Sequence, residues 1–356
     1  MQYQENQELF QQVVSAETRL REKLQSVDIK SLCITEYNQR KWEKKLKNLS
    51  GSLSTYGYLL RLSFSNCSIP IQKSVFVDYG GGCGILSFLA KELGVGTVIY
   101  NDIYEGSCND VKLFSNALEL PLEYIVCGDV DKLIEYIRKN SIIVNSIASY
   151  DVLEHLYDVE YHFNLLLSLS NPHFRLVYAS GANNENPMKV HKLKKIHINA
   201  EYKNREEKWG HKETDSSRAY FDVRKDIISN YAPDLRPDQV EKLSRATRGL
   251  IKLDIEKAVD EYRNRGEIAY RNNHPTNTCD PYTGSWCEQL ISIKWLQDIL
   301  KKSGFSVKIL SGYNNRQVSL PKNIMVYILN TLIRLLGRRG LFIAPYYIVI
   351  ADCHIE

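Results

Sequence analysis

The sequence predicts an α/β protein with a doubly wound sheet. Between residues 74 and 180, five short apolar runs alternate with four amphipathic stretches, which is the pattern of parallel strands joined by helices. A glycine-rich segment follows the first run directly. The alternation returns after residue 289 with two more apolar runs, so we expect seven strands. The predicted strands are 75–77, 97–100, 122–126, 142–149, 174–179, 305–310 and 341–352.

Apolar residues at helical spacing predict the helices and divide the chain. Helix patterns fill the N-terminal 72 residues, and a polar, basic and aromatic stretch interrupts the α/β alternation after residue 180. We therefore expect an N-terminal helical segment over 1–72, a cofactor-binding core over 73–180, an inserted, mainly helical cap over 181–288 and the rest of the core over 289–356. The predicted helices are 4–27, 36–64, 85–93, 107–118, 130–139, 157–169, 237–262, 293–303 and 322–336.

Composition excludes several function classes. The 356 residues are 44% apolar, and their mild net charge of +4 does not by itself indicate a nucleic-acid partner, which usually needs a concentrated basic face. The eight cysteines form no C-x-x-C pair, so we expect free thiols in a reducing compartment and a cytoplasmic protein. Residues 1–10 are polar, unlike a signal peptide. Residues 324–336 are too short to span a bilayer. Residues 325–336, with Arg334, Arg338 and Arg339, could form a helix on a membrane surface, but packing against the sheet explains their apolar positions more simply, so we expect no membrane partner.

The strongest motif is a glycine-rich turn after the first predicted strand. Asp78 ends that strand, and Gly80, Gly82 and Gly84 follow before the helix that starts at Ile85. Glycines allow a tight turn and a close approach of ligand to backbone. The dinucleotide pattern G-x-G-x-x-G would need a glycine at position 85. The Asp78 carboxylate would repel a pyrophosphate, whereas it suits S-adenosylmethionine (SAM), which carries an ammonium and a sulfonium.

Acidic residues also end the next strands. Asp102 ends the second strand, where a carboxylate can accept hydrogen bonds from both ribose hydroxyls. Asp129 follows the third strand and could accept from the adenine amine, and Asp151 follows the fourth. We expect Ile103 and Val130, the neighbours of two of these acids, to line the same cofactor site.

These residues resemble the motifs of class I SAM-dependent methyltransferases, well over 74–180 and loosely over 288–352. The segment 78–84 is similar to the family's first motif, Asp102 to its ribose acid, and Gly128-Asp129 to its adenine-side acid. The segment 151–155, Asp-Val-Leu-Glu-His, resembles the fourth-strand motif of the branch that contains the quinone-biosynthesis O-methyltransferases. The resemblance implies a Rossmann-like core and SAM as methyl donor, with S-adenosylhomocysteine (SAH) as product. The long insertion departs from that branch and leaves the acceptor open.

His155 is the first candidate for a catalytic base, because it follows the fourth strand and imidazole transfers protons near neutral pH. Packing at the start of the next helix explains it equally well. The resemblance also implies Asp151, Glu154 and His155 as ligands of a divalent metal, although their spacing alone does not predict one. We expect substrate contacts from the turn-rich segment 274–288, with Trp286 and Glu288 first.

The insertion is basic, with His191, His197 and His211 among eight Lys or Arg residues between 189 and 212. This pattern suits either a solvated face or a cap that attracts an anionic substrate. We expect a small-molecule acceptor, with oxygen preferred over nitrogen or carbon, and a sugar or secondary metabolite as the working guess. Two alternatives stay open, a nicotinamide-dependent oxidoreductase and a non-catalytic SAM-binding protein. The oligomeric state is left undetermined.

Overall fold

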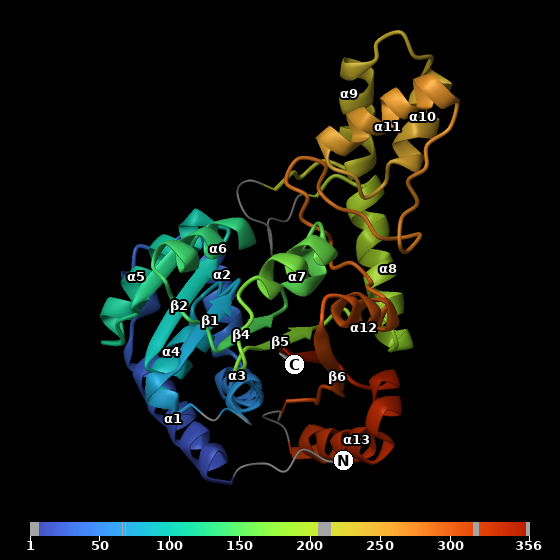
Figure 1. The fold of residues 1–356 in the computed structure, drawn as a ribbon. Helices are drawn as coiled ribbons and strands as arrows, with labels where there is room; N and C mark the ends of the chain where they lie inside the picture. Colours follow the sequence, from blue (N-terminus) through green and yellow to red (C-terminus); the bar gives the residue numbers. More distant parts are fainter. Residues whose placement is uncertain (1–6, 66, 68, 206–214, 316–319, 354–356) are drawn as a thin grey trace. The chain divides into compact units, whose positions relative to one another are not determined.

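The computed structural model describes residues 7–65, 67, 69–205, 215–315 and 320–353 (Figure 1). Contacts within the chain group these residues into two compact units. The core unit comprises Met1–Leu153, Val159–Ser180 and Leu296–Glu356, and the inserted unit comprises Glu154–Asp158 and Gly181–Trp295.

A seven-stranded sheet forms the centre of the core unit and confirms the predicted fold class. The strand order is β3-β2-β1-β4-β5-β7-β6, and the order reverses direction between β1 and β4. Strands β1 to β5 run parallel, whereas β7 lies antiparallel between β5 and β6. The strands are β1 Val75–Tyr79, β2 Thr97–Asp102, β3 Tyr124–Cys127, β4 Ser146–Tyr150, β5 Arg175–Ser180, β6 Phe305–Ser311 and β7 Tyr347–Cys353.

Two strands begin four or more residues later than the sequence pattern predicts. β4 begins at Ser146, because Asn145 uses its backbone and side chain to bind Val75 at the start of β1. β7 begins at Tyr347, because Gly337–Phe342 forms the 3-10 helix η4. Apolar residues before each strand made the predicted runs too long.

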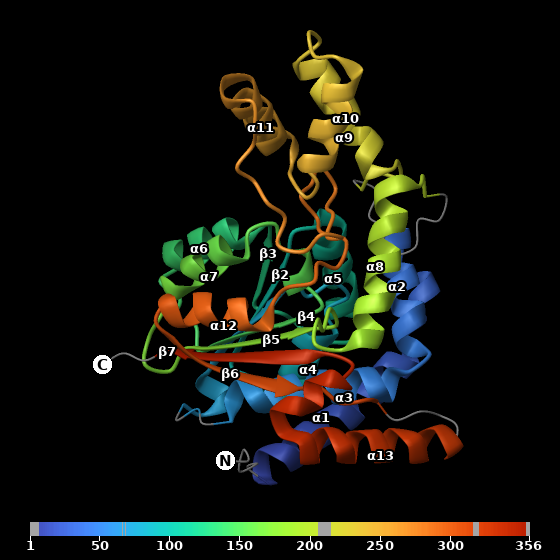
Figure 2. The ribbon, with the colours of Figure 1, turned by 90° about the vertical axis from the view of Figure 1, so that its right-hand side faces the viewer.

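Helices cover both faces of the sheet (Figure 2). The N-terminal helices α1 and α3 pack with α4 and with one face of the sheet in a single hydrophobic core. The expected helix 36–64 is two helices, because the backbone of Asn48 leaves the helical region with φ −141° and ψ 54°. The helices of the core unit are α1 Gln7–Ser26, α2 Glu36–Leu46, α3 Leu49–Phe64, α4 Ile85–Leu93, α5 Glu105–Ala117, α6 Val130–Lys139, α7 Val159–Leu167 and α13 Leu320–Leu336, together with α12 Ile293–Lys302 from Leu296 on.

The inserted unit has a hydrophobic core of its own, formed mainly by three of its four helices. The expected helix 237–262 is two helices, because Gly249 adopts φ 92°, a conformation that ends a regular helix. The helices of the inserted unit are α8 Pro187–Tyr202, α9 Tyr220–Tyr231, α10 Pro237–Ala246 and α11 Lys252–Arg265.

A buried ion pair joins the helices of the inserted unit. The guanidinium of Arg224 on α9 binds the carboxylate of Glu201 on α8, and both side chains are almost completely buried. Thr278 donates to the other Glu201 oxygen at 2.7 Å, and Arg224 Nε donates to the carbonyl of Ser244 at 2.9 Å. Arg224 Nη1 is buried and has no hydrogen-bond partner among the described residues. The pair still holds its elements in one arrangement, since breaking it would leave an uncompensated buried charge.

Candidate functional site

The turn after β1 has the backbone geometry that its glycines predict. Gly80, Gly82 and Gly84 all have left-handed φ angles, of 67°, 52° and 76°. Side chains crowd most of the turn: a Cβ at Gly80 would collide with Val152, and one at Gly84 would lie 2.6 Å from Val111. Gly82 differs, because no described atom lies within 4 Å of the place where its Cβ would be. The backbone at Gly82 therefore borders open space.

Asp78 is buried beneath this turn, with 2% of its surface exposed. Its Oδ2 accepts hydrogen bonds from the backbone N–H of Ser87 at 3.0 Å and from the Ser87 hydroxyl at 2.7 Å. These bonds tie the end of β1 to the first turn of α4, where helix N–H groups need acceptors. Burial raises the pKa of the Asp78 carboxyl to about 7, although the bonds from Ser87 oppose that rise.

Asp102 supports the turn from the end of β2. One carboxylate oxygen accepts from the N–H of Gly82 at 2.9 Å, and the other accepts from the N–H of Tyr104 at 2.8 Å. Asp102 is 7% exposed. A carboxylate oxygen can accept more than one hydrogen bond, and the expected bonds from a ribose to Asp102 stay a prediction.

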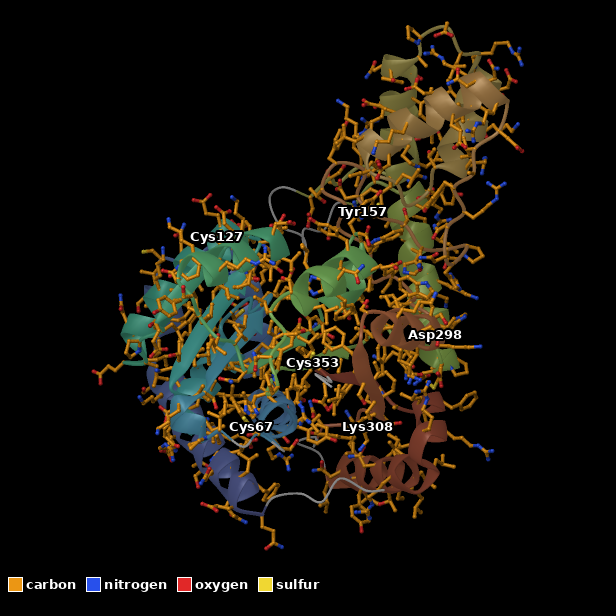
Figure 3. The ribbon with its side chains drawn as sticks, viewed as in Figure 1. Cys67, Cys127, Tyr157, Asp298, Lys308 and Cys353 are labelled. Atoms are coloured by element: carbon orange, nitrogen blue, oxygen red, sulfur yellow. The ribbon has the colours of Figure 1, made fainter. Side chains whose placement is uncertain are left out.

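The residues after Asp102 and around Asp129 differ in exposure. Ile103 is 65% exposed, unusual for a large apolar residue next to a buried strand end. Val130 is buried at the start of α6. Asp129 caps that helix by accepting from the N–H of Lys132 at 3.2 Å. Ile103 follows β2, and Asp129 and Val130 follow β3, which ends at Cys127 (Figure 3). Because β2 and β3 are parallel, they end at the same edge of the sheet.

Asp151, directly after β4, adopts a strained backbone conformation. Its φ is 55°, which non-glycine residues rarely adopt, and its N–H donates to the carbonyl of Ala179 on β5 at 2.9 Å. Strained residues persist where the surroundings hold them, often at functional sites. The strain lies at the point where the strand order reverses, which is where α/β sheets bind their ligands.

Sequence reasoning missed the contribution of α2. Lys45 donates to the Tyr56 hydroxyl at 2.8 Å and lies over the rings of Tyr56 and Tyr150, 5.0 and 5.3 Å from their centroids. Lys41, one turn earlier, is partly buried, and burial lowers the pKa of its ammonium. Tyr150 is the last residue of β4, so these two lysines lie close to the carboxyl edge of the sheet. A helix pattern alone could not predict this position.

Side chains on α5 hold α2 in that place. Asp110 accepts from the Thr35 hydroxyl at 2.6 Å and from the Asn38 amide at 2.7 Å. Asn38 also accepts a bond from the thiol of Cys83, within the glycine turn, at 3.8 Å. The start of α2 is therefore bonded to both α5 and the turn.

His155 belongs to the inserted unit, where the structure determines its tautomer. Its Nδ1 lies 2.7 Å from the carbonyl of Trp286, so Nδ1 carries a proton and donates it to that carbonyl. The ring is exposed. This is the tautomer that a general base requires, so His155 stays a candidate.

The other expected residues of the inserted unit have structural contacts. Trp286 is 7% exposed, stacks on Tyr157 and donates its indole N–H to the Tyr157 carbonyl at 3.2 Å. Glu288 is half-buried with φ 50°, and its carbonyl accepts from His197 at 3.0 Å. His197 is buried, and that burial lowers its pKa. His211 lies outside the described residues.

The described part of the chain gives no support to a metal centre. Among the described residues, no three His, Cys, Asp or Glu side chains are grouped to hold a metal ion. Asp151 belongs to the core unit, whereas Glu154 and His155 belong to the inserted unit. The Glu154 carboxylate accepts from the N–H of Gly181 at 3.1 Å.

No family model and no curated protein matches the chain. Among solved structures, it is similar to a SAM-dependent methyltransferase from Archaeoglobus fulgidus (17% identity, 86% of this chain, 96% of that chain, TM-score 0.38). It is also similar to a methyltransferase from Mesorhizobium loti (13% identity, 85% of this chain, 97% of that chain, TM-score 0.35). A third similar structure is a plantazolicin methyltransferase in complex with a triazolic desmethylPZN analog and SAH (11% identity, 98% of this chain, 99% of that chain, TM-score 0.37). These three TM-scores are below 0.5, and these similarities do not assign a function to the chain.

The open space at Gly82 makes a substitution informative. Gly82→Ala should abolish most binding of SAH, because its methyl group enters the space above the turn. Gly94→Ala is the matched control, since Gly94 also has a left-handed φ, of 86°, and also borders open space. Both variants should lose about 1–2 kcal/mol of stability from backbone strain. Titration calorimetry with SAH and thermal unfolding measure the two effects; equal affinities in both variants would contradict this role of the turn.

The raised pKa of Asp78 predicts opposite pH trends for stability and binding. The folded protein holds the Asp78 proton more tightly than the unfolded chain, so the free protein should lose stability as pH rises from about 4 to 7. The ammonium group of SAH favours the ionised carboxylate, so SAH affinity should rise between about pH 5.5 and 7.5, by up to about twenty-fold. An ordinary α-amino group, with pKa about 7.7–8.0, keeps more than half of its charge over this range. Asp78→Asn should remove both the pH dependence of stability and the pH dependence of SAH affinity. A pH dependence that remains in this variant belongs to another titratable group.

Proposed function

We propose that this protein is a SAM-dependent methyltransferase whose cofactor binds at the carboxyl ends of β1, β2 and β4. The observation that carries the proposal is the pair of buried carboxylates, Asp78 and Asp102, on either side of a glycine turn that is open at Gly82. Two acids there disfavour a pyrophosphate and favour a ligand that has cationic groups and ribose hydroxyls.

Each part of the expected ligand has a counterpart in this chain. Asp102 would accept from the ribose hydroxyls, and the exposed side chain of Ile103 would pack against the adenine. Asp78 lies beneath the turn, where its charge would attract the ammonium group. Lys41 and Lys45 would pair with the carboxylate of the amino-acid portion, because they lie near the end of β4 and are partly buried.

The cofactor supplies a methyl group already activated by positive sulfur, so the protein has to orient the acceptor and exclude water. We propose a hydroxyl acceptor on a small molecule, in keeping with His155 as a base. The Trp286 carbonyl holds Nδ1 protonated, and Nε2 would take the acceptor proton. We also propose Trp286 and Glu288, which belong to the inserted unit as His155 does, as residues that contact the substrate.

Ligand binding tests the cofactor assignment directly. SAM and SAH should raise the melting temperature, since a ligand at a hundred times its Kd adds about 2.7 kcal/mol to the stability of the folded state. NAD should have no effect, because Asp78 and the glycine spacing disfavour its pyrophosphate. A shift with NAD and none with either S-adenosyl ligand would replace this proposal by an oxidoreductase.

Turnover distinguishes an enzyme from a non-catalytic SAM-binding protein. His155→Gln should reduce SAH formation from SAM by about 10²–10⁴-fold in the presence of a pooled small-molecule extract, with SAH affinity unchanged. His191→Gln, at an exposed position on α8, is the matched control and should keep wild-type turnover. Unchanged turnover in His155→Gln removes His155 from the base role, whereas cofactor binding with no turnover in the wild type indicates a binding protein.

A further inference from the structure

Helix α13 turns most of its apolar side chains to solvent. Only Ile333 on this helix is buried among the described residues, whereas Ile324, Ile328 and Leu335 are 57%, 49% and 76% exposed. The expectation that this segment packs on the sheet through its apolar positions is therefore wrong for most of them. The exposed apolar residues of α13 are Leu320, Ile324, Met325, Tyr327, Ile328, Leu332, Leu335 and Leu336.

These side chains form one continuous face, since they recur at spacings of three and four residues. The opposite side of the helix attaches α13 to the core unit. Asn330 accepts from the N–H of Asn314 at 2.7 Å and donates to its carbonyl at 2.9 Å, directly after β6. Phe342, just beyond the helix, is also 61% exposed. Soluble monomers rarely expose a contiguous apolar face of this kind, so it marks an interaction surface.

The segment of the chain that contains this face is positively charged. Residues 299–351 contain eight Lys or Arg and no Asp or Glu, whereas the whole chain has a net charge of only +4, so the rest of the chain is net acidic. The nearest acids in sequence are Asp298 on α12 (Figure 3) and Asp352 on β7. Lys322, Arg334 and Arg339 are exposed on or next to α13. A basic helix with an apolar face is typical of a membrane surface.

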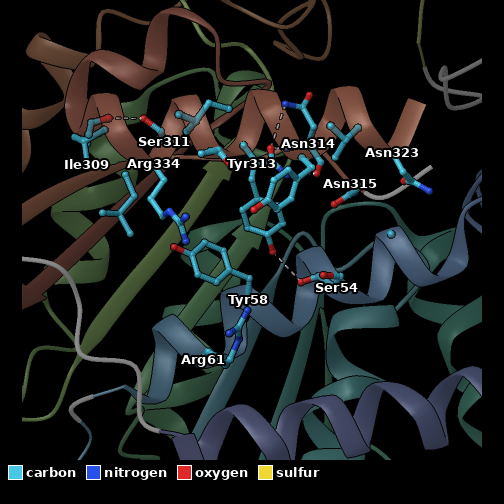
Figure 4. Close-up of a pocket in the computed structure, with 18 of the residues that line it drawn as sticks. Ser54, Tyr58, Arg61, Ile309, Ser311, Tyr313, Asn314, Asn315, Asn323 and Arg334 are labelled. Carbon is cyan, nitrogen blue, oxygen red and sulfur yellow. Dashed lines mark hydrogen bonds between the residues drawn. The ribbon is translucent and has the colours of Figure 1, made fainter. Parts of the chain in front are cut away.

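A cavity of about 1210 Å³ lies beside α13, bordered by α3 and β6 (Figure 4). Its lining contains four cationic residues and no Asp or Glu. Figure 4 shows Arg334 of α13 and Tyr58 of α3 pointing toward one another across the cavity. Tyr58 and Tyr313 pack edge to face with ring centroids 5.1 Å apart. The four cations are Arg61, Lys308, Arg334 and Arg338.

We propose that α13 docks this protein on a membrane that contains anionic phospholipid. The apolar face enters the boundary between headgroups and acyl chains, and the exposed cations on and next to α13, Lys322, Arg334 and Arg339, pair with lipid phosphates. The helix has 17 residues, fewer than the about 20 needed to span a bilayer, and no described helix is long and apolar enough to cross one. A second copy of the chain is a poorer occupant, since it would bring a second set of cations.

Vesicle co-sedimentation tests the proposal on the full chain. The wild type should bind vesicles of phosphatidylcholine with phosphatidylglycerol, bind phosphatidylcholine alone far more weakly, and lose affinity as salt rises from about 0.15 M to about 1 M. Ile324→Glu with Leu335→Glu should reduce the affinity at least about tenfold, because apolar area leaves the interface. Arg334→Glu with Arg339→Glu should reduce it at least about twenty-fold.

Matched controls make the same changes of charge elsewhere. Ile143→Glu with Leu253→Glu replaces apolar residues that are 69% and 63% exposed, and Arg138→Glu with Lys139→Glu replaces exposed cations at the end of α6. Both controls should bind vesicles more tightly than their α13 counterparts. Every variant should keep wild-type SAH affinity and melting temperature, which separates this test from that of the methyltransferase proposal.

Three results would overturn membrane docking. Equal losses of vesicle affinity in the α13 variants and in the controls would show that only the net charge of the protein matters. Light scattering could detect a dimer of the wild type that Ile324→Glu with Leu335→Glu abolishes. If that wild-type protein also fails to bind vesicles, the apolar face belongs to a contact with a second copy. Binding of soluble glycerol phosphate without binding of the phosphatidylglycerol vesicles would assign the cations to a free anion.

Discussion

The bond between the buried Asp78 carboxylate and Ser87 is the interaction on which the candidate site depends. It joins the end of a central strand to the first turn of α4, so the residues between them must turn within a few positions. Only glycines adopt the left-handed angles that this short connection requires without strain. Asp102 then binds the turn from β2, so two neighbouring strands determine one backbone surface. The same burial that makes the connection rigid raises the pKa of Asp78.

The rest of the core unit keeps that surface in place. Strands β1, β2 and β4 end at one edge because they are parallel, and β7 adds an antiparallel strand that pairs with both β5 and β6. The N-terminal helices cover one face of the sheet and also contribute side chains to the proposed site. α2 is bonded to Asp110 on α5 and thereby brings Lys41 and Lys45 to the end of β4. A cationic contribution from outside the α/β alternation is thus part of the proposed site.

Charge is unevenly distributed in the core unit. Acids end the first two strands and follow the third and fourth, whereas residues 299–351 have eight cations and no acid. The first arrangement suits a small cationic ligand at a buried turn, and the second suits an extended anionic surface. If both proposals hold, the protein would carry out its chemistry on one part of the core unit and attach to lipid through another. Salt should weaken the second function more than the first, because exposed charges are screened and buried ones much less so.

The sequence by itself determined the order of strands and helices in the α/β core, since hydrophobic periodicity and glycine positions are local signals. The seven-stranded sheet is confirmed for that reason, while the site residues remain predictions. Tertiary structure decided what local patterns cannot contain. Asn48 and Gly249 divide two predicted helices through single backbone conformations, and Asp110 places α2 beside the glycine turn. For α13, the hydrophobic periodicity predicted the helix correctly. The same periodicity, however, describes an apolar face that packs on the protein and one that does not. Only the folded chain shows that most apolar side chains of α13 remain exposed.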